Sequence, residues 1–375
     1  MNENFNNINW DKINEPDIHE EMLFAIRNLA SNDDDIRSDS LWDLFDCIYH
    51  QGSLSPGAGF AVPFLITRLQ QETEAGILQN ILYVLASLAT GSSYCDVHQD
   101  LEVNKEKRNT VEFQERMKEE LNDVKATYTA VDKGINVYID LLEHQSKDIR
   151  IAAACVLSCC KQDLAKICSN FYEKFNRESD ELVKAAIALF LAYLSKQIPV
   201  QIAFFEKILN SNESDIVKLS SGISLAYIAG EHMSDGALDI LIDKLQQPNL
   251  LNKLYDNFEN KLIDFYYLSL LNFFSNLNHQ QLTRVIPVLL KVEKSHYGFD
   301  DLFELVFNDR IIPEGSFFQD LTDTEQLTIK AVVEDDTLHN VSYMGGFLDK
   351  LGGNGLIVKQ KLIGFINGES LNYDR

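Results

Sequence analysis

Apolar residues recur with a helical period in three consecutive stretches of the chain. From Ile149 to Cys160 they lie at offsets 0, 4, 7, 8 and 11, and the stretch from Leu182 to Tyr193 repeats these offsets. Such offsets place the side chains on one face of an α-helix. A third copy begins at Ile216 and is weaker, because Ser220 and Ser224 occupy two of its five positions. The pattern predicts three amphipathic helices.

These helices start at a nearly constant spacing. Asp148, Glu181 and Asp215 are separated by 33 and 34 residues, and a polar break precedes each of them. A shorter amphipathic helix comes before each break, so the repeated unit is a helix, a tight turn and a second helix. One such hairpin cannot bury both of its faces, whereas stacked hairpins bury a continuous core. We therefore predict an all-α fold, an α-solenoid of about seven antiparallel helix pairs.

The helix pairs are expected to run along the whole chain as a single α-solenoid, 1–375. The N-terminal repeats fill 1–93, and a charged insertion, 94–131, contains a long helix from about Thr110. Central repeats follow over 132–310, and a C-terminal capping segment covers 311–375. The pairs should begin near residues 20, 58, 132, 163, 199, 234 and 280. Within the sixth pair, Asn249 to Asn260 is expected to lengthen the turn.

Two short motifs resemble HEAT repeats, which form armadillo-like α-solenoids. Asp35-Ile36-Arg37 and Asp148-Ile149-Arg150 are similar to the HEAT turn, in which an Asp caps the second helix. The segments 61–65 and 285–289 each carry a proline, as the first helix of a HEAT unit does. The resemblance implies the solenoid fold.

Longer segments resemble a bacterial group of largely uncharacterised HEAT-repeat proteins. These segments run from Trp42 to Leu65 and from Leu321 to Leu348. This resemblance implies a fold but no defined activity, because repeat scaffolds of this kind host unrelated functions.

Charge limits the choice of partner. The formal net charge is -24, and the first fifty residues hold twelve Asp and Glu against three Lys and Arg. Such a surface repels phosphate backbones and anionic membranes and attracts cations. We expect a basic protein partner and no binding to nucleic acid or to membranes.

The chain shows no targeting or membrane-spanning pattern. No basic start followed by an apolar stretch occurs before residue 30, and no run of about 18 apolar residues occurs anywhere. The six cysteines lack the spacing of a disulfide framework, so free thiols are favoured. We expect a cytoplasmic protein and favour a monomer.

Several catalytic and metal-binding patterns are missing from the sequence. Cys155, Cys159 and Cys160 lack a matching Cys or His set for zinc. His19-Glu20 is the only His-Glu pair, whereas the di-iron hydroxylases among helical-repeat proteins use recurring pairs. No Gly-x-Ser-x-Gly elbow and no phosphate loop is present. We therefore predict no catalytic residue, metal or cofactor.

One predicted second helix combines an aromatic residue with acids. Trp42 lies among Asp39, Asp43 and Asp46, and an aromatic anchor beside charge is typical of an interaction hot spot. A Trp in a terminal repeat is more often part of the core, and His50 with Gly52 is favoured as a cap at the helix end. The candidate partner-binding residues are Trp42, Asp39, Asp43, Asp46, Tyr49 and His50.

The sequence thus favours a non-enzymatic interaction scaffold or adaptor with a curved acidic surface. One alternative is an immunity-type inhibitor that neutralises a basic toxin nuclease, and the identity of the bound protein would reveal it. Another is an enzyme or accessory lyase acting on a cofactor or a modified protein, which a bound metal or chromophore would indicate.

Overall fold

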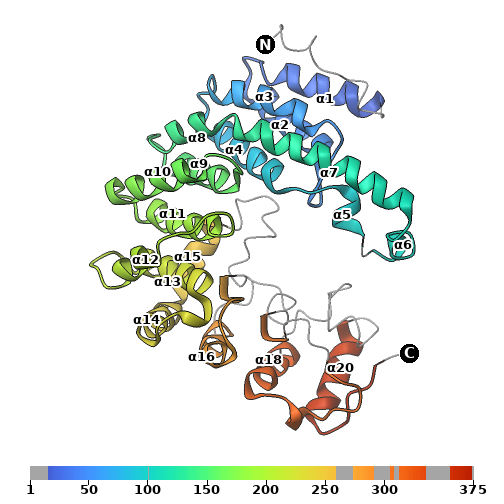
Figure 1. Cartoon of the computed structure of the whole chain (residues 1–375), viewed down its shortest axis with the longest axis vertical. Coiled ribbons are helices and arrows are strands. Elements are labelled where there is room, and N and C mark those ends of the chain that lie inside the picture. Colours follow the sequence, from blue (N-terminus) through green and yellow to red (C-terminus); the bar gives the residue numbers. More distant parts are fainter. Residues whose placement is uncertain are drawn as a thin grey trace. The chain divides into compact units, whose positions relative to one another are not determined.

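Most of the chain that the structure describes is helical (Figure 1). The computed structural model describes residues 16–99, 101–258, 273–290, 305–307, 312–334 and 355–373. Within these ranges the only paired strands are β1 (Tyr49–His50) and β2 (Ser53–Leu54), two residues each. The expected all-α class is confirmed.

The chain divides into two compact units after Val200. The helices of the first unit are α1 (Pro16–Asn28), α2 (Asp34–Ile48), α3 (Ala58–Leu69), α4 (Ala75–Thr90), α5 (Tyr94–His98), α6 (Glu102–Lys105), α7 (Val111–Asp132), α8 (Ile135–Leu141), α9 (Lys147–Cys159), α10 (Leu164–Arg177) and α11 (Glu181–Leu194). Those of the second are α12 (Ile202–Leu209), α13 (Asp215–Ala229), η3 (Gly230–His232), α14 (Asp235–Leu245), α15 (Pro248–Phe258), α16 (His279–Leu289), η7 (Phe318–Asp320), α18 (Asp323–Glu334) and α20 (Gly355–Ile366).

Neighbouring hairpins pack side by side in the first unit. Helices α2, α4, α9 and α11 form one row, in which each contacts the next, and α1, α3 and α7 form a second row. The long helix expected from about Thr110 is α7, and it packs on both α3 and α4 (Figure 1). It therefore belongs to the packed rows along its C-terminal half, where Val124, Thr127 and Val131 are buried.

The second helices are buried on more sides than the sequence indicated. The offsets predicted a single apolar face, yet every residue of α9 from Ile151 to Cys159 is buried. Small side chains between the large ones, including Ala152, Ala154 and Ser158, let neighbouring helices approach the remaining faces. In α11 the buried set likewise extends around the helix, with Ala185, Ala188 and Ala192 among its members.

The Asp of the HEAT-like turn does not cap its helix. Asp33 is the N-cap of α2, and its carboxylate accepts hydrogen bonds from the amides of Asp35 and Ile36. In α9 the N-cap is Ser146, and Asp148 lies inside the first turn. The implied capping role was therefore wrong for Asp35 and Asp148. Acidic residues remain favourable in a first turn because they oppose the positive end of the helix dipole.

The Arg of the same turn bridges two neighbouring hairpins. Arg37 Nε and Nη2 donate to the two carboxylate oxygens of Glu72, at 2.9 and 3.0 Å, and Nη1 donates to the carbonyl of Ser31. Glu72 also accepts from the amides of Thr73 and Glu74, at the start of α4. The bridge therefore joins the first turn of α2 to the N-terminus of α4 through a bidentate pair.

The bridge occurs a second time with the same atoms. Arg150 Nε and Nη2 donate to Glu178 at 2.9 and 3.2 Å, and Nη1 donates to the carbonyl of His144. Glu178 accepts from the amides of Ser179 and Asp180, just before α11. We call the two contacts, Arg37–Glu72 and Arg150–Glu178, the Arg–Glu bridges.

Acid should weaken the first Arg–Glu bridge. Burial alone would raise the pKa of Glu72, but hydrogen bonds from Arg37, two backbone amides and Arg68 outweigh it and lower that pKa from 4.5 to about 2. Because the folded-state pKa lies below the unfolded one, the stabilisation is complete above pH 4.5 and is lost as the pH falls toward 2. The expected loss is about 3 kcal/mol.

Urea unfolding of the wild type and of Glu72→Gln at several pH values in this window would measure the loss. The stability difference between the two proteins should shrink as the pH falls. Glu173→Gln, which changes an exposed carboxylate on α10, is the matched control. The stability difference between the wild type and Glu173→Gln should not change with pH. A wild-type advantage over Glu72→Gln that is constant across the window would contradict the assigned pKa.

A β-hairpin follows α2, where the sequence suggested a helix cap. Tyr49 pairs with Leu54 and His50 with Ser53, and the turn residues Gln51 and Gly52 have φ of 48° and 85°. Two positive φ values at the centre of a two-residue loop fit the twist of a hairpin. Gly52 is thus a turn residue, and the interpretation of His50 and Gly52 as a helix end was wrong.

In the second unit α13 contacts α12, α14 and α15, and α16 contacts α14 and α18. The expected long turn at Asn249–Asn260 was wrong as far as the structure describes it, because α15 continues through Phe258. A C-terminal core gathers buried residues around α18 and α20, among them Ile329, Leu362 and Phe365. Tyr373 donates to the carbonyl of Ile312 at 2.5 Å and closes this core.

Candidate functional site

The solvent face of α2 is acidic. Asp39, Asp43 and Asp46 are exposed at offsets 0, 4 and 7, while Leu41 and Leu44 are buried on the opposite side. None of these three carboxylates forms an ion pair with any residue that the structure describes. The face therefore presents negative charge that no described residue pairs with.

Trp42 lies half-buried beside these acids. Its ring meets the edge of Phe45 at 6.1 Å, and Phe45 stacks on Tyr49 at 5.0 Å. Tyr49 is only 4% exposed, so it is the buried end of the row Trp42, Phe45 and Tyr49 and does not reach the surface. His50 is exposed in the hairpin. Of the six sequence candidates, α2 brings four together at its surface, namely Trp42, Asp39, Asp43 and Asp46.

Helix α1 adds to this face. The Cys47 thiol lies 4.0 Å from the Glu21 carboxylate. Burial raises the pKa of Cys47, and the charges of Glu21, Asp43 and Asp46 raise it further. A thiol with a raised pKa stays protonated and is a poor nucleophile. We define the acidic face as Glu21, Asp39, Trp42, Asp43 and Asp46.

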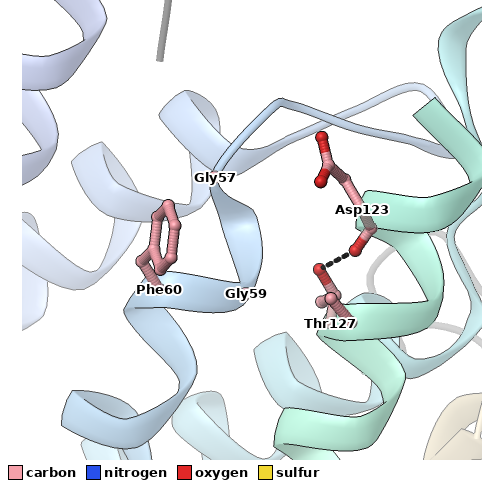
Figure 2. A pocket seen from close by; sticks show the side chains of 6 residues that line it. Gly57, Gly59, Phe60, Asp123 and Thr127 are labelled. Carbon is pink, nitrogen blue, oxygen red and sulfur yellow. Dashed lines mark hydrogen bonds between the residues drawn. The ribbon is translucent and has the colours of Figure 1, made fainter. Parts of the chain in front are cut away.

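A pocket lies between the N-terminus of α3 and the middle of α7 (Figure 2). Its volume is about 180 Å³. The residues that line it are Gly57, Gly59, Phe60, Asp123, Ala126 and Thr127. Figure 2 shows the Phe60 ring on one side of the Gly57–Gly59 segment and the Asp123 side chain on the other. We call this the α3–α7 pocket.

Two glycines shape the α3–α7 pocket. Gly57 has φ of 86° and is the N-cap of α3, so no side chain caps the first turn. At Gly59 a Cβ would lie 3.1 Å from Thr127 Oγ1 and 3.3 Å from Thr127 Cα, so glycine permits the close approach of α3 to α7. Thr127 Oγ1 donates to the carbonyl of Asp123 at 2.9 Å and leaves the carboxylate of Asp123 uninvolved.

The acids of α7 lead toward this pocket. Glu112, Glu115, Glu119 and Asp123 fall at offsets 0, 3, 7 and 11 and so lie along one side of the helix. The first three are exposed and Asp123 is half-buried. Among the described residues, none of the four has an ion-pair partner. The sequence analysis missed this stripe, because the pocket depends on α3 and α7 packing together across more than fifty intervening residues.

Cysteines, histidines and carboxylates are the groups that could form a metal or thiol site. Over these ranges no group of three or more His, Cys, Asp or Glu is placed to hold a metal ion. Cys155 and Cys159 are buried in α9 and Cys160 is buried at its C-cap, and burial raises the pKa of Cys155 and of Cys160 well above the ordinary value. No described helix is both long enough and apolar enough to cross a membrane.

Comparison with known proteins adds no family. No family model matches the chain, and no curated protein matches it. Among solved structures the chain is similar to the crystal structure of an engineered protein, at 13% identity. The match covers 92% of this chain and 88% of that chain, with a TM-score of 0.28. At this TM-score the similarity does not bear on the fold or on the function.

Proposed function

We propose that the chain is a non-enzymatic interaction scaffold, a HEAT-like α-solenoid that binds a basic partner protein on its acidic surface. The observation that carries the proposal is the acidic face, where exposed carboxylates without an ion-pair partner among the described residues surround a half-buried Trp42. Hairpins stacked in rows and two equivalent Arg–Glu bridges support the solenoid. The site requires no covalent chemistry.

The acidic face combines the two elements of a binding hot spot. A half-buried tryptophan offers a large contact area at low conformational cost, and its packing on Phe45 fixes its orientation before a partner arrives. The surrounding carboxylates attract a basic partner over long range and raise its rate of association. Attraction should act mainly on the association rate, and Trp42 mainly on the dissociation rate.

Binding assays on variants of the acidic face test the proposal. The full chain is immobilised, a basic protein is captured and purified, and its kinetics are measured at low and at physiological salt. Trp42→Ala should weaken binding by about thirtyfold. The triple variant Asp39→Asn, Asp43→Asn, Asp46→Asn should slow association by about tenfold at low salt and by less at physiological salt.

The control triple variant carries the same change in charge elsewhere. Asp140→Asn, Glu173→Gln and Glu206→Gln alter exposed carboxylates on α8, α10 and α12. If the association of this variant slows as much as that of the first triple variant, the attraction is spread over the whole surface and the acidic face is not the binding site. If the wild type captures no basic protein, the proposed function itself is wrong. A captured nuclease that the chain inhibits would define the partner as a toxin.

A further inference from the structure

We propose that the α3–α7 pocket receives a lysine or arginine side chain of the basic partner. This inference rests on the proposed function and adds a second contact point to it. The pocket lies near the acidic face along the chain: the amide of Ser55, just before α3, donates to the carbonyl of Ile48, the last residue of α2, at 3.0 Å. One partner could therefore engage both places.

Charge selects a cation for this pocket. The half-buried carboxylate of Asp123 makes no hydrogen bond or ion pair with the described residues. A charge that is partly withdrawn from water gains most from an opposite charge with donors of its own, as an ammonium or a guanidinium provides. Glu119, one turn earlier on the same side of α7, adds a second negative charge.

The N-terminus of α3 acts in the opposite direction. It carries roughly half a positive charge, which by itself would favour an anion. Asp123 supplies a full negative charge at the same pocket and outweighs it, and the stripe Glu112, Glu115 and Glu119 extends the negative potential along α7. The balance therefore favours a cation.

The size and the lining of the α3–α7 pocket indicate that it holds a single side chain. A volume of about 180 Å³ is smaller than the roughly 300–1,000 Å³ of pockets that hold whole small molecules. Gly57 and Gly59 contribute only backbone to the pocket wall, next to the Asp123 side chain (Figure 2). The methylene groups of Lys or Arg can lie on bare backbone there. The head group can then pair with Asp123.

The acidic stripe gives the contact a direction. Three exposed carboxylates, Glu112, Glu115 and Glu119, follow α7 away from the pocket at one-turn intervals. A basic segment with one side chain in the pocket would meet these acids with its next basic residues. The pocket sets the position of the segment, and the stripe adds screened, salt-dependent attraction.

The test uses the full chain with methyl-labelled alanine and threonine, titrated with a blocked hexa-arginine peptide. Global binding is followed by calorimetry, and occupation of the pocket by the methyl signals of Ala126 and Thr127. We expect both methyl signals to shift in a saturable way. Asp123→Asn should weaken binding and so raise the dissociation constant read at Thr127 by about tenfold.

Two further variants complete the test. Glu115→Gln removes the same charge from the same helix outside the pocket and should change that constant by about twofold or less. Ala126→Trp fills the pocket from an exposed position without changing charge and should abolish the shift at Thr127. Circular dichroism melting of each variant checks that the fold is retained.

The outcomes separate the two proposals. If Asp123→Asn and Glu115→Gln behave alike, or if the peptide binds without moving the Thr127 methyl, the pocket assignment is wrong while the acidic face stands. If inorganic phosphate moves that methyl and the peptide does not, the pocket is an anion site and the assignment is overturned. If the peptide does not bind the chain at all, the proposed function fails with it.

Discussion

Replacing Arg37 by Met should lower the free energy of unfolding by about 3–5 kcal/mol, because it leaves the buried carboxylate of Glu72 without its bidentate partner. Arg68 still reaches Glu72 at 3.0 Å, but through one contact from its own hairpin. The hairpin of α1 and α2 therefore loses its side-chain contact with the turn that precedes α4. Urea unfolding of the full chain, followed by circular dichroism, measures the change.

Two other variants make this result specific. Arg177→Met removes a cation whose pair with Glu143 is exposed on both sides and should cost about 0.5 kcal/mol or less. The double variant Arg37→Met, Glu72→Met removes both charges and should recover most of the loss, since no unpaired charge stays buried. If Arg37→Met is as mild as Arg177→Met, the bridge does not stabilise the fold.

Gly230→Ala should destabilise the second unit by about 3–5 kcal/mol. Gly230 follows α13 with φ of 52° and ψ of -127°, a combination that is essentially restricted to glycine. A Cβ there would lie 2.6 Å from the backbone oxygen of Asn276. The neighbouring contacts hold this oxygen in place, because the side-chain amide of Asn276 donates to the carbonyl of Tyr227 at 2.6 Å.

Gly236 offers the matched control. It lies in the first turn of α14, and a Cβ at this position meets nothing within 4 Å. Gly236→Ala should therefore leave stability unchanged or raise it by about 0.5 kcal/mol. Thermal melting monitored at a helical wavelength compares the two variants. Equal melting temperatures would show that the backbone at Gly230 can relax to accept a side chain.

The period of the apolar residues was sufficient to predict most helices. The second helices expected at Asp148, Glu181 and Asp215 begin at Lys147, Glu181 and Asp215. The N-termini of these helices could be predicted because hydrophobic periodicity and polar breaks are local properties of the chain. The long helix expected from about Thr110 begins at Val111, but a sequence does not show that this helix, α7, packs on α3 and α4.

The polar details were harder to predict because they join distant residues. The HEAT-like turn drew attention to Asp35 and Arg37, yet the residue that matters between hairpins is Arg37, and its partner Glu72 is 35 residues away. A local signal for that partner existed: Glu72 and Glu178 each lie two residues before the acidic N-cap of the next second helix. The turn Gln51-Gly52 was missed because Gln rarely adopts a positive φ.

The sequence predicted which candidate residues lie on the surface of α2, but it did not predict which of them are buried. The spacing of Asp39, Asp43 and Asp46 shows that they share a face, whereas the burial of Tyr49, which stacks on Phe45, depends on tertiary packing. The α3–α7 pocket could not be predicted at all. Its walls come from two helices whose contact is a tertiary property, and its glycines resemble ordinary turn residues in the sequence.

The Arg–Glu bridges give the stack a direction. In both bridges the hairpin nearer the N-terminus supplies the guanidinium, and the following hairpin supplies the carboxylate. The contact is thus head-to-tail: the two surfaces that meet are different, and neither can pair with a copy of itself. An inserted hairpin would fit between two bridged neighbours only if it carried a carboxylate on its leading edge and a guanidinium on its trailing edge.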